Sequence, residues 1–195
     1  MNIKIFVVTL FFLSLLSACG LESDNNSDPD DGSNSSTDNT GDSGTRSDDI
    51  IGDCTLTDRE RSLFNAINDA RTEARYCGTR SMTAVPALKW HCTLGQAAYN
   101  HSKDMAEVGF FSHTGSDGSS LGTRIDQAGY DYSNAAENIW HTEETVNSVM
   151  DSWLNNRGNC QNIMNNAFLH MGAGIYESSS SPFGIYWTLK LATPR

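Results

Sequence analysis

Positively charged residues are scarce in this sequence. Its 195 residues include 13 Lys and Arg against 24 Asp and Glu, which gives a formal net charge of −11. A nucleic-acid-binding domain needs a basic surface to contact phosphates, so this balance argues against a nucleic-acid partner. The apolar share of 38% and the aromatic share of 9% are still enough for a globular core, so the chain is not disordered throughout.

A long apolar run is also missing. The N-terminal run covers residues 5–16, is interrupted by Thr9 and Ser14, and follows Lys4. It is too short for a stable transmembrane helix but is typical of a signal peptide, which we assign to residues 1–18. Small residues then precede Cys19, as in the lipobox of bacterial lipoproteins. This resemblance implies cleavage before Cys19 and acylation of that cysteine, which would anchor the chain in a membrane.

Residues 21–53 contain no aromatic side chain and only one basic residue, Arg46, against ten acidic residues. Such a segment buries too little apolar surface to offset its conformational entropy. We therefore expect residues 19–53 to form a lipidated cysteine followed by a disordered acidic tether. Residues 54–195 have a charge near balance and suit one domain.

The sequence has no C-x-x-C motif, which argues against a zinc site built from cysteines. It also has no internal repeat of fixed period. Apart from Cys19, the cysteines are Cys54, Cys77, Cys92 and Cys160. An even number in an exported chain predicts two disulfides, and the sequence alone leaves three possible pairings.

Periodicity predicts helices followed by strands in this domain. Thr57 and Glu60 form a capping-box pattern, and the helix that they open is expected to end near residues 77–78. Further helices are predicted over residues 93–108 and 121–128, and after an N-cap at Thr142. Residues 171–177 and 184–192 alternate as a hairpin of half-buried strands, and residues 137–141 suggest a third strand. The fold class is therefore α+β with an antiparallel sheet.

Several short motifs occur in a fixed order along this domain. The most specific are the segment from Phe110 to Gly118, which reads FFSHTGSDG, and the Glu-Asn-Ile motif that starts at Glu137. In this order and spacing they resemble the bacterial branch of the CAP superfamily, also called the SCP or cysteine-rich secretory protein domain. The resemblance covers residues 56–192. It implies a three-layer α-β-α sandwich with a small antiparallel sheet and a central cleft.

The resemblance also implies which residues line the cleft. His113 matches the first histidine of the family, and Glu137 matches its glutamate. The family's second histidine is replaced by Asn159, and the nearby serine by Asn156. Relatives carry cysteines at the positions of Cys77 and Cys160, which suggests one disulfide between them and another between Cys54 and Cys92.

The replaced histidine bears on metal binding. Some family members hold a divalent metal in the cleft, but an amide oxygen is a poor zinc ligand. Only His113 and Glu137 remain as good candidate ligands. His101 is expected to hydrogen bond within the core. We therefore predict that the cleft binds zinc weakly or not at all and that the protein needs no cofactor.

Three functions are compatible with these features. The first is a non-catalytic binding module, lipid-anchored outside the cytoplasm of a bacterium, with a lipid or other envelope molecule as ligand. Gly20 after Cys19 is compatible with the outer membrane. The second is a hydrolase that uses Ser112, His113 and Glu137, although the sequence lacks a nucleophile elbow. The third is a structural component of the envelope.

Overall fold

The computed structural model describes residues 47–195. The expected signal peptide, the acylated Cys19 and most of the acidic tether lie outside these residues. In the described part of the chain, no helix is long and apolar enough to cross a membrane.

A mixed five-stranded sheet forms the centre of the domain, with strand order β1-β4-β6-β7-β5. The strands are β1 (Ile50–Ile51), β4 (Lys89–His91), β6 (His170–Glu177), β7 (Ile185–Pro194) and β5 (Tyr132–His141). The long strand β7 is antiparallel to both of its neighbours, β5 and β6, whereas β4 pairs in parallel with β6 and β1 in parallel with β4. A separate hairpin consists of β2 (Arg75–Cys77) and β3 (Arg80–Met82).

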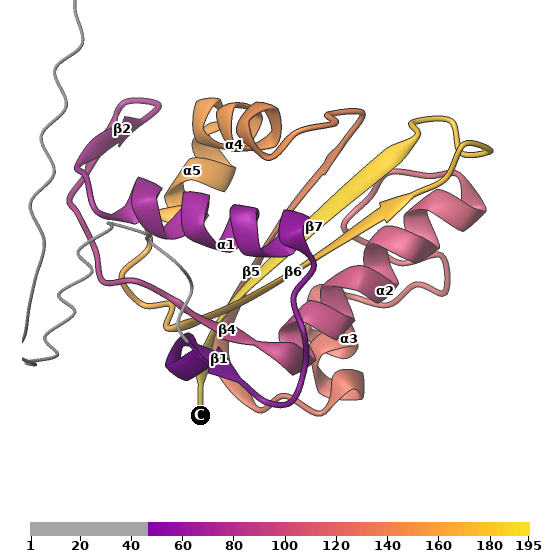
Figure 1. Cartoon of the computed structure of the whole chain (residues 1–195), viewed down its shortest axis with the longest axis horizontal. Coiled ribbons are helices and arrows are strands. Elements are labelled where there is room, and N and C mark those ends of the chain that lie inside the picture. Colours follow the sequence, from indigo (N-terminus) through magenta and orange to yellow (C-terminus); the bar gives the residue numbers. More distant parts are fainter. Residues whose placement is uncertain (1–46) are drawn as a thin grey trace, which may run out of the picture. The chain divides into compact units, whose positions relative to one another are not determined.

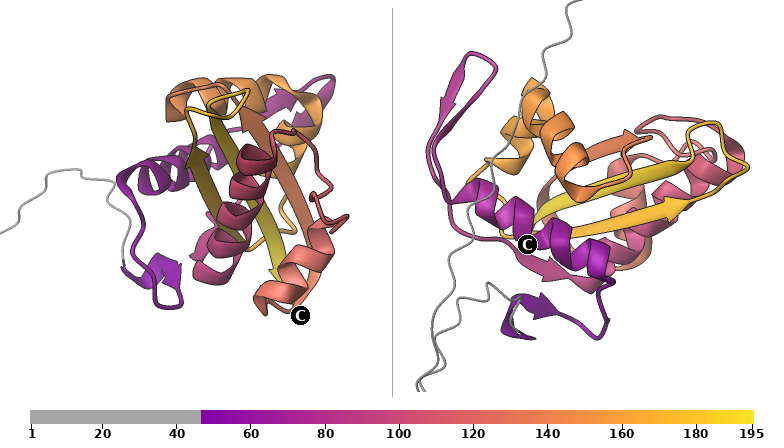
Figure 2. Two further views of the ribbon diagram at one scale, coloured as in Figure 1. Left: turned by 90° about the vertical axis from the view of Figure 1, so that its right-hand side faces the viewer. Right: turned by 45° about the horizontal axis from the view of Figure 1, so that its top comes forward.

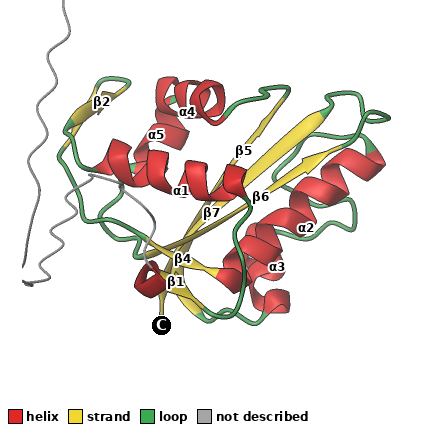
Figure 3. Ribbon diagram, viewed as in Figure 1, coloured by secondary structure: helices red, strands yellow, loops and turns green. Residues whose placement is uncertain are grey.

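Helices cover both faces of the sheet (Figure 1). On one face lie α2 (Cys92–Val108) and α3 (Leu121–Ala128), and on the other lie α1 (Asp58–Arg71), α4 (Val146–Asn155) and α5 (Arg157–Ile163). A short 3-10 helix, η1 (Ser47–Asp49), precedes β1. Figure 2 shows α2 lying along the sheet, and Figure 3 separates the helical layers from the strands between them. This arrangement confirms the predicted three-layer α-β-α sandwich.

Several predicted local features are present. Thr57 and Glu60 form the predicted capping box of α1, and α3 ends at Gly129 as expected. The predicted β6–β7 hairpin is also present. The structure has the disulfides Cys54–Cys92 and Cys77–Cys160, which is the pairing that the resemblance implied.

The prediction for the end of the first helix was wrong. The helix ends at Arg71, and residues 77–78 belong to the hairpin instead. The buried Arg71 guanidinium donates hydrogen bonds to the carbonyl oxygens of Pro86, Ile163 and Asn165. These bonds attach the end of the helix to the segment before β4, to the end of α5 and to the segment after α5. Such long-range contacts cannot be predicted from helical periodicity.

Two further predictions need correction. Thr142 does not cap α4, because Thr145 is its N-cap and Thr142 adopts a positive φ of 73° after β5. In addition, Ile50 and Ile51 lie in the sheet as β1, although the sequence assigned them to the tether. Ile50 packs against the main core, which gives this acidic segment an apolar attachment.

The strand β7 is more buried than its alternation predicted. All residues from Ile185 to Ala192 are buried. One set of alternating side chains packs into the main core with α1, α4 and α5, and the other set faces α2. A half-buried strand was expected because the polar residues suggested a solvent face, but α2 covers that face. Lys190 is consequently placed inside the protein.

Candidate functional site

The candidate site lies between the sheet and the α2–α3 layer. Glu137 comes from β5, and its side chain is only 2% exposed. Lys190 lies directly opposite on β7, so the two side chains share one face of the sheet. His101 comes from α2 and Arg124 from α3, whereas His113 lies in the connection between these helices.

The carboxylate of Glu137 is surrounded by nitrogen atoms. Its Oε1 accepts a hydrogen bond from Nδ1 of His113 at 2.9 Å. Its Oε2 accepts one from Nζ of Lys190 at 2.6 Å, and Arg124 reaches both oxygens at 3.0–3.1 Å. Nε2 of His101 lies 3.7 Å from Oε1. Both oxygens of Glu137 are therefore already used by partners within the protein.

These contacts determine the charge states in the site. Burial opposes the charge of Glu137, but the hydrogen bond from His113 and the charge of Lys190 lower its pKa to about 2. Burial lowers the pKa of Lys190 to about 8, with Glu137 opposing that shift. Burial also lowers the pKa of His101 to about 4. At neutral pH the site thus contains one carboxylate, two cations and a neutral His101.

His113 and His101 have different surroundings. The His113 side chain is 60% exposed, and its Nδ1 is held by Glu137. His101 is buried, and its Nε2 donates to the carbonyl oxygen of Ser112 at 3.0 Å, which agrees with the predicted core hydrogen bond. Its contact with Glu137 was not predicted. Of the two histidines, His113 is therefore the one that is accessible to solvent and to a ligand.

The two asparagines predicted in the cleft are not among the partners of Glu137 or His113. Oδ1 of Asn156 accepts from the amides of Gly158 and Asn159 and caps α5. The carbonyl of Asn159 accepts from Asn138, whose side chain points to the opposite face of β5 from Glu137. The structure brings His113 and Glu137 together, but it places α5 across the sheet from them.

Ser112 is not arranged as a nucleophile for His113. Its hydroxyl accepts a hydrogen bond from the amide of Thr114 at 3.0 Å. Nδ1 of His113 forms its hydrogen bond with Glu137, not with Ser112. A base and its orienting carboxylate are thus present, whereas the hydroxyl is used in a local turn.

The charges around Glu137 do not fit a divalent metal. Zinc prefers anionic or imidazole ligands, but two cationic side chains, Lys190 and Arg124, already contact the only carboxylate of this site. Within residues 47–195, no group of three or more His, Cys, Asp or Glu side chains is placed to hold a metal ion. His113 and Glu137 remain the two candidate ligands, but the carboxylate of Glu137 is already bound by Lys190 and Arg124.

Lys190 and Arg124 are the site residues that sequence reasoning missed. Arg124 was not predicted as a site residue, and its guanidinium also donates to the carbonyl oxygens of Ser119 and His113. The one available signal was a lysine within the alternating apolar residues of β7. That signal points to Glu137 only once the register of β5 and β7 is known.

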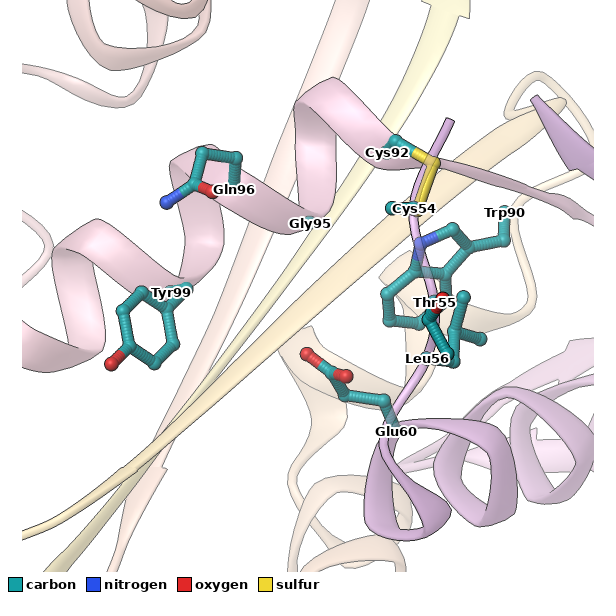
Figure 4. A pocket seen from close by; sticks show the side chains of 9 residues that line it. All are labelled: Cys54, Thr55, Leu56, Glu60, Trp90, Cys92, Gly95, Gln96 and Tyr99. Atoms are coloured by element: carbon teal, nitrogen blue, oxygen red, sulfur yellow. A yellow bond between two sulfur atoms is a disulfide. The ribbon is translucent and has the colours of Figure 1, made fainter. Parts of the chain in front are cut away.

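A separate pocket of about 260 Å³ lies between the start of α1 and α2 (Figure 4). In Figure 4 the carboxylate of Glu60 points into the space between the helices, with Tyr99 on one side and Trp90 on the other. The Cys54–Cys92 disulfide closes one end of it. None of the predicted cleft residues lines this pocket.

The profile of the Cysteine-rich secretory protein family matches residues 64–191. The chain is 31% identical over 88 residues to the uncharacterized membrane protein YlbC of Bacillus subtilis, covering 45% of this chain and 25% of YlbC. It is 34% identical over 88 residues to the uncharacterized protein YkwD of the same organism, covering 45% of this chain and 34% of YkwD. The match thus spans about a third or less of each relative's length.

Solved structures show the same fold. An extracellular SCP-domain protein from Bacillus anthracis has a TM-score of 0.59 at 23% identity, covering 72% of this chain and 45% of that one. An outer surface protein from Borrelia burgdorferi has a TM-score of 0.61 at 16% identity, covering 74% of this chain and all of that one. Together with the profile match over more than half of the sequence, this shows that the chain belongs to the cysteine-rich secretory protein (CAP/SCP) family.

Proposed function

We propose that this protein is a lipid-anchored CAP-domain module outside the cytoplasm of a bacterium, which binds a lipid or another envelope molecule without catalysing a reaction. The signal-peptide pattern and the lipobox at Cys19 support anchoring. The extracellular and outer-surface proteins with the same fold support the location. The outer membrane is the proposed destination in a bacterium with two membranes, and no nucleic acid is expected as a partner.

One observation carries the non-catalytic assignment. Both oxygens of Glu137 are bound by His113, Lys190 and Arg124, so the carboxylate has no free oxygen with which to act on a substrate. The group left exposed is the His113 ring, which is fixed in orientation and suited to ligand recognition. We propose in addition that the cleft binds divalent metal weakly or not at all.

Mass spectrometry of the native full-length protein, purified from membranes in mild detergent, tests this function. We expect a diacyl or triacyl modification at Cys19 and a co-purified envelope molecule. His113→Ala should lower the amount of that molecule, whereas His170→Ala, a substitution outside the cleft, should leave it unchanged. An unmodified Cys19, or the same bound molecule at equal amounts in both variants, would contradict the proposal.

The second candidate is a hydrolase. It is favoured by one observation, the 2.9 Å hydrogen bond that orients His113 on Glu137, because this pair resembles a general base and its orienting carboxylate. Labelling with a serine-reactive phosphonate probe tests it. Labelling that disappears in Ser112→Ala but persists in Ser180→Ala would favour the hydrolase over the binding module.

A further inference from the structure

The pocket between the start of α1 and α2 carries charge of one sign. Among the described residues that line it, Glu60 has the only carboxylate, and none is Lys, Arg or His. The neighbouring Arg59 does not line the pocket and is paired with Glu177. The carboxylate of Glu60 points into the space between the two helices (Figure 4). A ligand that enters this space therefore meets a negative side chain and no positive one.

One oxygen of Glu60 is fixed and the other is available. Oε2 accepts hydrogen bonds from the backbone amide and from the hydroxyl of Thr57, both at 2.8 Å. These bonds belong to the capping box of α1, and they hold the carboxylate in place. Within residues 47–195, no group donates a hydrogen bond to Oε1. Glu60 thus differs from Glu137, whose two oxygens are both bonded within the protein.

Aromatic rings flank this carboxylate. Tyr99 lies on one side of Glu60 and Trp90 on the other (Figure 4). Tyr99 is 37% exposed, and its ring packs edge-on against Tyr176, with 5.7 Å between the ring centroids. Gly95 leaves the indole of Trp90 uncovered, because a Cβ atom there would lie 3.1 Å from Cζ2 of the indole. Since the face of an aromatic ring attracts cations, the rings and the carboxylate favour the same kind of ligand.

Trp90 also brings an unused hydrogen-bond donor to the pocket. Trp153 and Trp187 both donate through Nε1 to backbone carbonyl oxygens. Trp90 is only 2% exposed, yet its Nε1 donates to no acceptor in the part of the chain that the structure describes. A buried donor is costly when it stays unpaired, so an acceptor on a bound ligand would stabilise it. Glu60 would repel an anionic acceptor, and a neutral hydroxyl oxygen is therefore the better match.

We propose that this pocket binds a small aliphatic amino alcohol. The ammonium group of the ligand donates to Oε1 of Glu60 beside the ring of Tyr99, and its hydroxyl oxygen accepts from Nε1 of Trp90. The pocket volume of about 260 Å³ equals that of roughly nine water molecules, which limits the ligand to a similar number of non-hydrogen atoms. Neither His113 nor Glu137 lines the pocket, so this inference goes beyond the function proposed for the cleft and does not depend on it.

Titration of the full-length protein in detergent with 5-amino-1-pentanol, followed by NMR of the indole N–H groups, tests this site. The sequence has four tryptophans, and Trp90→Phe identifies the signal of Trp90. That signal should shift until the site is saturated, whereas the other three should stay nearly constant. The uncharged 1,5-pentanediol and the anionic 5-aminopentanoate should each bind at least about tenfold more weakly, because the first lacks the ammonium group and the second is repelled by Glu60.

Variants of the pocket residues test the role of each group. Glu60→Gln removes the charge but keeps an acceptor for the capping box, and it should weaken binding at least about tenfold. Tyr99→Leu should weaken binding by about threefold, the size of a cation–π contact near the surface. Glu73→Gln removes an exposed carboxylate just beyond the other end of α1 and should leave binding unchanged. His113→Ala should also leave it unchanged, which separates this site from the cleft.

Three results would overturn the proposal. The first is that 5-amino-1-pentanol causes no saturable shift of the Trp90 signal. The second is that the diol or the aminopentanoate binds as tightly as the amino alcohol. The third is that folded Glu60→Gln binds as tightly as the unaltered protein. The comparison of the three ligands uses the unaltered protein only, so it decides the matter even where a variant does not fold. Loss of binding in His113→Ala would show that the site is not the pocket at Glu60.

Discussion

At the scale of single residues, replacing Glu137 and replacing Lys190 leave different charged groups without a partner. Without Lys190, the carboxylate still has His113 and Arg124 as partners. Without Glu137, two buried cations face each other with no carboxylate between them. The loss of the carboxylate should therefore be the more damaging change, although each substitution removes a single charge.

Glu137→Gln should lower the free energy of unfolding by about 3–5 kcal/mol, the range found when one partner of a buried ion pair is removed. Lys190→Met should cost less than half of that. The double variant Glu137→Gln/Lys190→Met should recover part of the loss, because it no longer buries an unpaired Lys190. Urea unfolding of the four proteins, followed by circular dichroism, measures these differences. Equal losses in the two single variants would show that Arg124 and His113 do not support Glu137 as described.

At the scale of secondary-structure elements, the contact between α2 and β6 depends on glycine. A Cβ atom at Gly174 would lie 2.0 Å from the amide nitrogen of Tyr99, and one at Gly172 would lie 2.1 Å from that of Gly95. Both obstructing atoms belong to the backbone of α2 and cannot rotate away. The helix therefore rests directly on the strand, and this close approach places His101 over Glu137.

Gly174→Ala should destabilise the protein by about 3 kcal/mol or more, because overpacking against backbone forces the helix to move. The shift should also disturb the neighbouring site and change the NMR signal of the His101 ring. Gly158→Ala in α5 is a matched control, since a Cβ there would meet only Oδ1 of Asn156 at an ordinary 3.5 Å. That control should be neutral or slightly stabilising. A tolerated Gly174→Ala would mean that α2 does not lie as close to β6 as described.

The two disulfides occupy different environments. Cys54 is exposed, and its bridge to Cys92 attaches the segment after β1 to the start of α2. Cys77 and Cys160 are both fully buried, and they join the β2–β3 hairpin to α5. Access of a reductant should therefore differ between them.

Mild reduction followed by alkylation should label Cys54 and Cys92 well before Cys77 and Cys160. Peptide mass spectrometry at successive times measures this order. Adding a low concentration of urea should accelerate labelling of the buried pair only, because that pair must wait for local unfolding. Labelling of both bridges at the same rate would contradict the burial of Cys77 and Cys160.

Sequence periodicity predicted most elements of this fold but not what covers them. The alternation of β7 indicated a strand correctly, yet it assigned Lys190 to solvent because a polar residue in a strand is usually exposed. Only the layer formed by α2 makes that face internal. In the same way, the motifs predicted His113 and Glu137, whereas Lys190 and Arg124 join them through strand register and helix packing, which link residues far apart in the sequence.

At the scale of the whole molecule, the net charge of −11 conceals a domain with a small local excess of positive charge at its site. Most of the acidic excess lies before residue 54, in the expected tether. The stability of the domain against acid should therefore depend on a few buried groups rather than on the overall charge. His101 and Glu137 are two of these groups, since the pKa of each is well below its ordinary value.

The free energy of unfolding should decrease as the pH falls from about 6.5 to 4, and then further towards pH 2. In the folded protein the pKa of His101 is about 4, so below pH 6.5 the unfolded chain takes up a proton that the folded state excludes. This term amounts to about 3 kcal/mol once the pH is below 4. Glu137, whose pKa is about 2 in the folded state, stabilises the protein above pH 4.5 and loses that contribution as the pH falls towards 2.

Urea unfolding at pH 7, 5.5 and 4 measures the first phase, and His101→Asn is the control. The variant should start less stable at pH 7 but lose less stability on acidification, because it has no ring to protonate at that position. The loss that remains in it comes from other histidines with lowered pKa values, among them His91 and His170. If both proteins lose the same free energy of unfolding on acidification, protonation of His101 does not cause the acid sensitivity.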